Sequence, residues 1–279
     1  MMTHWPPVTA TTTRPRPDLS LAARRYGLLV RTFVVNDIRK RYVGSMMGFF
    51  WTVVQPLLEL VTYTFVFTVI LLVRFEEQYD TWTNALYLFC GMIAWLSFSE
   101  SLTRSVGVIR ENAHLIKKLS FPPSVLCAQV VLSEGFSALV RFVMLFVAAL
   151  LVRDQLAPHA ILFLPVLALQ LLFTMGLSML LATTQVYFKD TAHILAPALM
   201  IWMFITPIFY PASLFPKQFA PVLMLNPLSH LVGIYRELIL NGVFPQWGSV
   251  LIFTTMAVTT FLLGAVTFHR HRQRFPDLV

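Results

Sequence analysis

Six long apolar runs dominate this chain of 279 residues and decide what it can fold into. A helix needs about 20 mostly apolar residues to cross the hydrocarbon core of a bilayer. Only 12% of the residues are charged, whereas soluble domains carry about 25%. We therefore predict an all-α membrane protein with six transmembrane helices. The spans are expected at Phe49 to Val73, Ala85 to Val108, Ser124 to Val152, Ile161 to Tyr187, Ile194 to Tyr210 and Trp247 to Phe268.

The distribution of positive charge predicts the orientation of these spans. Sixteen of the 21 Lys and Arg residues lie before the first run, after the last run, or in the linkers 104–121 and 188–193. The other three linkers contain four, and Arg141 lies inside a run. Because cytoplasmic loops are enriched in Lys and Arg, both termini are expected in the cytoplasm. The net charge of +8 is then mainly a topology signal, and we expect contact with membrane lipid and no nucleic acid.

Four regions follow from this reading. Residues 1–20 are rich in Thr and Pro and are expected to be a disordered tail, without a removable signal peptide. Residues 21–48 form a cytoplasmic interfacial helix region, 49–268 the six-span domain, and 269–279 a basic cytoplasmic tail. The two cysteines fall in or beside apolar runs, where they behave as small hydrophobic side chains.

The outward segment Pro211 to Gln246 is too apolar for an ordinary loop and too interrupted by proline for two full spans. Asn226 can cap a helix that starts at Pro227, and Asn241-Gly242 can end it. Leu228, Leu231, Val232, Tyr235, Leu238 and Ile239 form a helical stripe, opposite Ser229, His230, Gly233, Arg236 and Glu237. We predict two short re-entrant helices packed on protein. A helix lying flat on the membrane surface is the alternative.

Charged residues within spans face a bundle interior or a water-filled path, because exposure to lipid is costly. Glu134 and Arg141 lie two turns apart on one stripe, which predicts a direct or bridged ion pair. Glu100 and Arg104 have the favourable i, i+4 order. We interpret these four residues as structural pairs that fix helix packing.

Two further stripes are candidates for lining a channel. Thr52, Gln55, Glu59, Tyr63 and Phe67 share one face of the first span, and Trp202, Thr206 and Phe209 share one of the fifth. For Glu59, helix packing and a transport path are equally compatible with the pattern. Aromatic rings near span ends fit interfacial belts, whereas the deeper Tyr63 and Trp202 could stack on a sugar.

Several kinds of chemistry are missing from the sequence. It contains no Gly-Lys dipeptide and so no phosphate-binding P-loop. It has neither Cys and His pairs at metal-ligand spacing nor a G-x-S-x-G motif. We therefore expect no enzymatic activity, no metal and no cofactor in this chain.

An amphipathic helix is predicted at Arg110 to Leu119, on the cytoplasmic side between the second and third runs. Its apolar stripe is Val108, Ile109, Leu115, Ile116 and Leu119, and its polar positions are Arg110, Glu111, Asn112, His114, Lys117 and Lys118. Mixed charge beside aliphatic residues suits docking into a groove on a soluble partner. Attachment along lipid headgroups is the alternative.

Three segments carry a resemblance to a known family. They are "RYVGSMMGFFWTVVQPLLELVTYTFVF" (Arg41 to Phe67), "NPLSHLVGIYRELILNG" (Asn226 to Gly242) and "FHRHRQRFPDLV" (Phe268 to Val279). Together they resemble the permease subunits of type-2 ABC exporters of cell-surface polysaccharides, such as O-antigen and teichoic acid exporters. The resemblance extends from about Leu21 to the end of the chain.

The resemblance implies a homodimer in a bacterial cytoplasmic (inner) membrane, with a channel for a lipid-linked polysaccharide. It implies a separate ABC ATPase that binds ATP and Mg and grips a coupling helix, here Arg110 to Leu119. An interfacial helix would lie at Leu21 to Tyr42, and gate helices within Pro216 to Leu225 and Pro227 to Leu240. The gate residues would include Pro227, His230, Tyr235, Arg236 and Glu237. An exporter of drugs or small lipids, an enzyme of glycan synthesis, and a passive assembly subunit are the competing interpretations.

Overall fold

The computed structural model describes residues 19–42, 48–76, 79–118, 121–153 and 158–279, and the regular elements within these ranges are all helical. The prediction for the N-terminal tail falls outside the described residues, apart from the first residues of α1. The all-helical fold class is confirmed. The helices are α1 (Leu19–Tyr42), α2 (Trp51–Thr64), α3 (Thr81–Glu111), α4 (Ala113–Lys118), α5 (Ser124–Arg153), α6 (Phe163–Tyr187), α7 (Thr191–Ile205), α8 (Ala220–Leu225), α9 (Pro227–Tyr235), α10 (Trp247–His271) and α11 (Phe275–Leu278).

Within the described ranges, five helical segments are long and apolar enough to cross a membrane. Two π-helical turns lengthen helices, Phe65–Ile70 after α2 and Arg236–Asn241 after α9. The predicted fifth span is shorter than expected, because α7 ends at Ile205. Pro207 follows, and a residue before proline is driven from helical to extended backbone; Thr206 has φ −78° and ψ 133°. The five candidate spans are Trp51–Ile70, Thr81–Glu111, Ser124–Val152, Pro158–Tyr187 and Trp247–Leu278.

Helix α3 is the central helix of the bundle. Of the residues in its most apolar stretch of 18, 83% are buried, and α3 packs against α5, α6, α7 and α9. Phe98 illustrates the packing: it is fully buried and stacks on Phe173 of α6, with ring centroids 5.7 Å apart. With 31 residues, α3 is about 46 Å long at 1.5 Å per residue. It therefore extends beyond a hydrocarbon core of about 30 Å.

Helices α6 and α10 approach each other closely through two facing glycines, Gly176 and Gly264. A Cβ atom on Gly176 would lie 2.5 Å from the backbone oxygen of Thr260 and 2.6 Å from Cα of Phe261. A Cβ atom on Gly264 would collide with the backbone carbonyl of Gly176. Small residues allow helix backbones to approach in this way, which increases van der Waals contact in membrane bundles.

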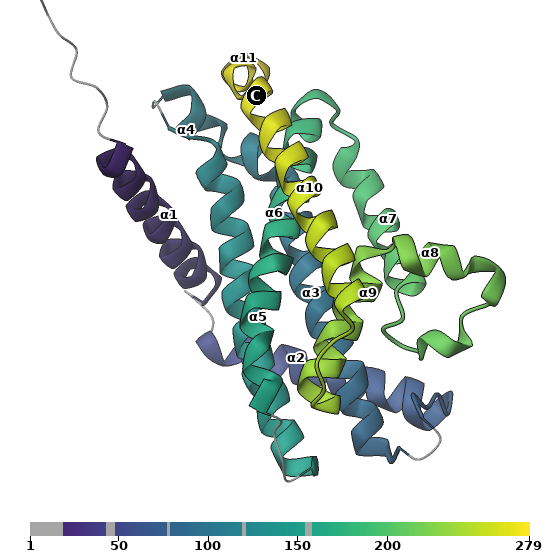
Figure 1. Cartoon of the computed structure of the whole chain (residues 1–279). Coiled ribbons are helices and arrows are strands. Elements are labelled where there is room, and N and C mark those ends of the chain that lie inside the picture. Colours follow the sequence, from purple (N-terminus) through teal and green to yellow (C-terminus); the bar gives the residue numbers. More distant parts are fainter. Residues whose placement is uncertain (1–18, 43–47, 77–78, 119–120, 154–157) are drawn as a thin grey trace, which may run out of the picture.

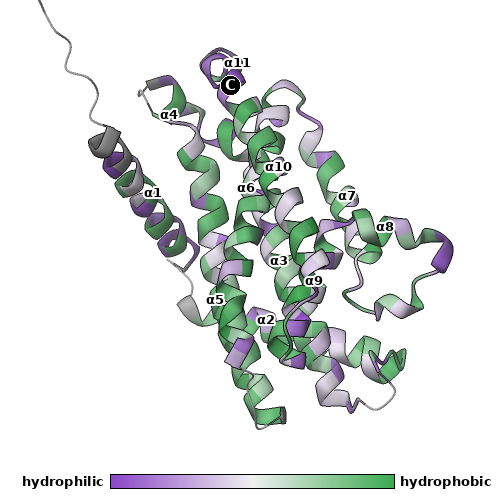
Figure 2. Cartoon of the chain, viewed as in Figure 1, coloured by the Kyte–Doolittle hydropathy of each residue, from purple (hydrophilic) through white to green (hydrophobic). Residues whose placement is uncertain are grey.

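The N-terminal helix α1 lies beside α5 at the edge of the bundle, as Figure 1 shows. The hydroxyl of Tyr26 donates a hydrogen bond to Ser124 Oγ at 3.1 Å, and the Phe33 and Phe121 rings are 5.1 Å apart. Tyr26 and Phe33 lie seven residues apart, which is about two helical turns, so they contact the bundle from one face of α1. Hydrophilic and hydrophobic residues alternate along α1, whereas hydrophobic residues predominate along α5 and α10 (Figure 2).

Helix α2 crosses the bundle at a steep angle to the other long helices (Figure 1). Within α2 and the π-turn that follows it, only 11% of the most apolar 18-residue stretch is buried, and Leu57, Leu58 and Val61 are exposed. This large uncovered apolar surface contrasts with the enclosed surface of α3.

The outward segment forms α8 and α9, and its start and stop signals are confirmed. The Asn226 side chain accepts a hydrogen bond from the Leu228 amide at 3.0 Å, and Pro227 is the first residue of α9. Gly242, with φ +67°, ends the following π-turn. The alternative of a helix flat on the surface is wrong for α9, which packs against α3, α6 and α10. All six predicted stripe residues are buried: Leu228, Leu231, Val232, Tyr235, Leu238 and Ile239.

Candidate functional site

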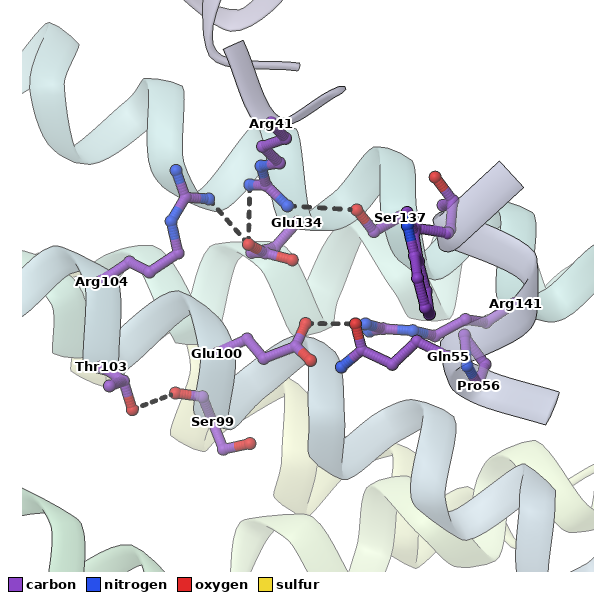
Figure 3. Close-up of a pocket in the computed structure, with 12 residues that line it drawn as sticks. Arg41, Gln55, Pro56, Ser99, Glu100, Thr103, Arg104, Glu134, Ser137 and Arg141 are labelled. Atoms are coloured by element: carbon purple, nitrogen blue, oxygen red, sulfur yellow. Dashed lines mark hydrogen bonds and ion pairs between the residues drawn. The ribbon is translucent and has the colours of Figure 1, made fainter. Parts of the chain in front are cut away.

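A polar cavity of ≈460 Å³ opens where α1, α2, α3 and α5 meet, and Figure 3 shows its lining. Trp51 and Pro56 contribute the apolar part of its wall. The remaining side chains are charged, amide or hydroxyl groups, which is unusual among apolar spans. They are Arg41, Thr52, Gln55, Ser99, Glu100, Thr103, Arg104, Glu134, Ser137 and Arg141.

Glu134 lies at the centre of the first acid-base group of this cavity. Its Oε1 atom is 2.7 Å from both the Arg41 and the Arg104 guanidinium groups. Arg104 also donates two hydrogen bonds to the Asp37 carboxylate, at 2.7 and 2.8 Å. Glu134 is only 1% exposed, and a buried carboxylate is stable only when it is paired and hydrogen-bonded. The group therefore links α1, α3 and α5 by charge.

The second acid-base pair joins Arg141 to Glu100 across α5 and α3, at 2.7 Å. The predicted pairing of Glu134 with Arg141 is wrong in its partners, because each binds a residue of another helix. The predicted proximity of Glu100 and Arg104 does not produce a pair either. Residues on two packed helices can lie closer together than two residues separated by two turns of the same helix. Glu134 and Arg141 therefore pair with residues of other helices.

Asp37 and Arg41 were missed by the sequence analysis as members of a site. Their spacing of four residues on a helix is a recognisable signal, and their side chains are 3.1 Å apart. Arg41 Nη1 also lies 3.4 Å from Ser137 Oγ. Only the fold shows that their face of α1 meets α5.

The stripe on α2 divides into two parts. Thr52 and Gln55 line the cavity, and Gln55 Nε2 donates a hydrogen bond to half-buried Glu59 at 3.2 Å. Farther along, Tyr63 and Phe67 leave the cavity and meet a ring that follows α7. Phe209 stacks on Phe67 with centroids 4.5 Å apart, and lies 5.3 Å from Tyr63. The α2 stripe and Phe209 thus contribute to one aromatic cluster.

Trp202, Thr206 and Phe209 do not share a helical face, because α7 ends before Thr206. Trp202 Nε1 donates to Asn226 Oδ1 at 2.9 Å, and Asn226 Nδ2 donates to Thr206 Oγ1 at 2.9 Å. Trp202 also meets Phe98 edge-on, with centroids 5.1 Å apart. In this conformation Trp202 and Thr206 fasten the start of α9 to α7.

The residues predicted for a gate lie in varied surroundings. Pro227 begins α9, and His230 Nε2 lies 2.9 Å from the Met224 carbonyl oxygen of α8. Tyr235 is fully buried and donates to Gln170 Oε1 at 2.8 Å. Glu237 Oε2 accepts a hydrogen bond from the Gln246 amide at 3.0 Å. These contacts join α8, α9, α6 and the start of α10.

Arg236 was expected on the polar side of its helix, and this is wrong. It is 9% exposed and donates to three backbone carbonyls, those of Tyr87, Pro207 and Ile208, at 2.8 to 3.2 Å. Its guanidinium also lies 4.6 Å from the centre of the Phe75 ring. Two of these carbonyls, those of Pro207 and Ile208, belong to the non-helical segment after α7, where no regular helical hydrogen bond occupies them.

The predicted cytoplasmic helix is broken in two. Helix α3 continues through Glu111, Asn112 has φ −106°, and α4 covers the next six residues. The Asn112 side chain donates back to the Val108 carbonyl at 2.9 Å. Leu119 lies outside the described residues, as does the side chain of Lys118.

The apolar residues of this segment face the chain's own core. Val108 and Ile109 are buried in α3, and Ile116 of α4 is 6% exposed within the same cluster. The outward face carries Glu111, His114 and Lys117, which are exposed, while Arg110 and Leu115 are partly covered. A partner would therefore meet mainly polar side chains, contrary to the predicted use of the aliphatic stripe.

Comparison with known proteins places these features in a family. The model of the ABC-2 type transporter family matches residues 29–240. The chain belongs to the ABC-2 type transporter family. It is therefore a multi-pass membrane subunit of a transporter rather than an enzyme.

Relatives of this ABC-2 protein align over most of its length. The O-antigen export system permease protein RfbA of Klebsiella pneumoniae is 30% identical over 247 residues, covering 88% of this chain and 92% of the relative. The protein of the same name from Myxococcus xanthus is 28% identical over 255 residues, covering 91% and 95%. The polysialic acid transport protein KpsM of Escherichia coli is 21% identical over 245 residues, covering 88% and 93%.

The ABC-2 match begins within α1 and ends inside the π-turn after α9. The polar cavity, the aromatic cluster and α4 all lie inside it. Helix α10 and the C-terminal turn lie outside it, although the pairwise relatives align over a longer stretch.

Proposed function

We propose that this ABC-2 protein is the permease subunit of an ATP-driven exporter that moves a lipid-linked polysaccharide from the cytoplasm to the outer side of a bacterial inner membrane. The observation that carries the proposal is the 30% identity to an O-antigen export permease over nearly the whole of both chains. The weaker similarity to polysialic acid and capsule export proteins, at 20 to 21%, supports the same class of cargo.

The proposal includes six membrane crossings, with α7 as the fifth. Its 15 residues give about 22 Å of helix, less than the hydrocarbon thickness. The apolar stretch that follows, through Phe209 and Tyr210, would complete the crossing while packed against α2 and α3. Irregular backbone at membrane depth is tolerated where protein covers it.

ATP and Mg²⁺ would be bound by a separate ATPase subunit, with no cofactor in this chain. The support is the exposed polar face of α4, at the end of α3 that extends beyond the bilayer. Glu111, His114 and Lys117 give this face mixed charge, suited to charge-assisted hydrogen bonds with a soluble protein.

A second copy of the chain would complete the channel. Uncovered apolar side chains on α2 and α7 support this arrangement, including Val61, Ile201 and Phe204. In a homodimer these faces would approach each other beside the aromatic cluster of Tyr63, Phe67 and Phe209. Aromatic rings present flat apolar faces on which a sugar ring can stack while its hydroxyl groups remain hydrated.

The polar cavity favours a hydrophilic cargo over the competing drug or small-lipid exporter. Three guanidinium and three carboxylate groups gather around it, so the charges of the described group cancel. A path for apolar drugs would not need buried charge at this cost. An enzyme of glycan synthesis is disfavoured by membership of a transporter family.

The decisive experiment deletes the gene from its natural host and locates the glycan. We expect lipid-linked polysaccharide to accumulate on the cytoplasmic side and to return to the surface on complementation. Unchanged surface glycan in the deletion strain would refute the proposed cargo.

The ATPase interface is tested by copurification. Reversing charge at the exposed Lys117, as Lys117→Glu, should reduce recovery of the ATPase with the permease. The matched control is Lys217→Glu, an exposed lysine beyond α7 on the predicted outer side. Equal loss of ATPase with both variants would contradict docking on α4.

Subunit pairing is tested by cysteine crosslinking, since the native Cys90 and Cys127 are buried. Ile201→Cys should crosslink between two copies in native membranes. Val143→Cys on exposed α5 is the control that should not. The opposite ranking would refute the proposed dimer face.

A further inference from the structure

The C-terminal turn packs against α4 and is not a free tail. We define the C-terminal hook as residues 272–279, which contain the 3₁₀ turn Arg272–Arg274 and α11. Phe275 within it is completely buried, and Val279 is half-buried against the same cluster. Arg272 and Arg274 beside it are exposed. The hook therefore holds its place chiefly through one aromatic side chain.

Phe275 lies at the junction of several helices. Its ring meets Phe268 of α10 edge-on, with centroids 5.2 Å apart and planes at 79°. The same buried cluster contains Ile116 of α4 and Ile109 of α3. Figure 1 shows α11 and α4 at the same end of the bundle, and the two helices are in contact. One ring thus connects the helix proposed to meet the ATPase with the last span.

The last span continues this connection to the opposite end of the molecule. Helix α10 begins at Trp247, five residues after the glycine that ends the π-turn. The Gln246 amide just before α10 donates to Glu237 in that turn, and α10 packs along α9. The close approach at Gly264 holds α10 against α6, which also packs on α9, so α6 and α10 would move together. A shift of α10 would therefore act directly on α9.

We propose that Phe275 is a positioning residue that fastens α4 to α10, so that displacement of α4 by the ATPase reaches α9 through the last span. The inference rests on the proposed function for the identity of the motor. Phe275 touches neither cargo nor ATPase in this scheme. Phe275 keeps α4 from moving independently of α10. If this contact is weakened, the ATPase would still hydrolyse ATP, but α9 would move less with each ATP hydrolysed.

The test uses the full permease with its ATPase in proteoliposomes and compares Phe275→Ala with Leu278→Ala. Leu278 belongs to the same hook but is 44% exposed. We expect Phe275→Ala to retain the ATPase and its hydrolysis rate, while glycan exported per ATP falls by about 2-fold to 30-fold, the range found for residues that couple distant sites. Phe275→Leu should restore much of the ratio, and Leu278→Ala should leave it unchanged. A wild-type ratio in Phe275→Ala would overturn the inference.

A second measurement separates this inference from the proposed cargo. Spin labels on Ala113, a partly exposed residue of α4 outside the proposed docking face, and on the exposed Arg270 of α10 report the distance between the two helices without any glycan. In the wild-type complex the distribution of distances should stay narrow on ATP addition. In Phe275→Ala it should broaden, and in Phe275→Leu it should broaden less. Identical distributions in all variants would overturn the role of Phe275. A wild-type complex that exports no glycan would instead refute the proposed function. Should Phe275→Ala fail to accumulate, Phe275→Leu decides the question, because a wild-type export ratio together with wild-type distances in that variant would overturn the inference.

Discussion

Substituting Gly264 by alanine should separate α6 from α10. The added Cβ would lie 2.8 Å from the carbonyl carbon of Gly176 and 2.9 Å from its Cα, in addition to its collision with the carbonyl oxygen. These obstacles are backbone atoms, which cannot rotate away, so the helices must move apart.

The magnitude follows from two opposing effects. Overpacking of a well-packed interior costs about 1 to 3 kcal/mol, and a rigid obstacle places Gly264→Ala near the upper end. Replacing glycine by alanine in a helix returns about 1 kcal/mol. We therefore expect a net destabilisation of about 2 kcal/mol, roughly a 30-fold change in the unfolding equilibrium.

Gly135→Ala provides a matched control on α5. A Cβ there would lie 2.9 Å from Cδ1 of Leu171, the flexible end of a side chain that can change rotamer. This variant should be neutral or slightly stabilised. The assay is equilibrium unfolding in mixed micelles, followed by tryptophan fluorescence. If Gly264→Ala proved as stable as Gly135→Ala, the backbone contact between α6 and α10 would not exist as described.

Three further predictions test other parts of the structure. Arg141→Met should destabilise the protein by about 2 to 4 kcal/mol because it leaves Glu100 unpaired. In the same unfolding assay, the double variant Arg141→Met, Glu100→Met should recover part of this stability, and no recovery would argue against the pair. Asp80 caps α3, and hydrogen bonds from the side chain and amide of Thr83 hold the pKa of this carboxyl below its usual range. The ionised Asp80 cap should contribute about 1 kcal/mol of stability. This contribution should be present above about pH 4 and lost as the pH falls through the lowered pKa of the folded state. The thermal unfolding temperatures of Asp80→Ala and wild type should therefore converge in acid, and a difference that stays constant with pH would contradict this. Asn226→Asp should keep the helix cap but lose the amide donor, so it should be less destabilised than Asn226→Ala when tryptophan fluorescence monitors unfolding; the reverse order would refute the cap.

The sequence predicted local structure well at residues with one strong conformational preference, such as a helix-capping asparagine or a glycine that ends a helix. Asn226 and Gly242 marked the ends of a helical unit, and the apolar stripe between them is buried as its period indicated. The long apolar runs likewise indicated helices. Pro207 was the overlooked signal that ends α7 early.

Relations between helices were harder to predict, because periodicity gives a face but not its neighbour. Glu134 and Arg141 lie on one stripe, yet each finds its partner on a different helix. Arg236 was assigned to a polar face, but it is buried and donates hydrogen bonds to the carbonyls of Pro207 and Ile208, in the irregular segment after α7, and of Tyr87 in α3. The aliphatic residues of α4 suggested a docking stripe, and Phe275, far away in sequence, covers them instead.

The charged group around Glu134 also sets an order on biogenesis. Asp37 is separated from Arg104 by 67 positions, and Arg104 from Glu134 by a further 30. During synthesis the first acidic and basic groups leave the ribosome long before α5 supplies the central carboxylate. A nascent chain that stops before Ser124 holds Asp37, Arg41 and Arg104 without the Glu134 carboxylate that joins them, so this charged group can close only after α5 has been inserted.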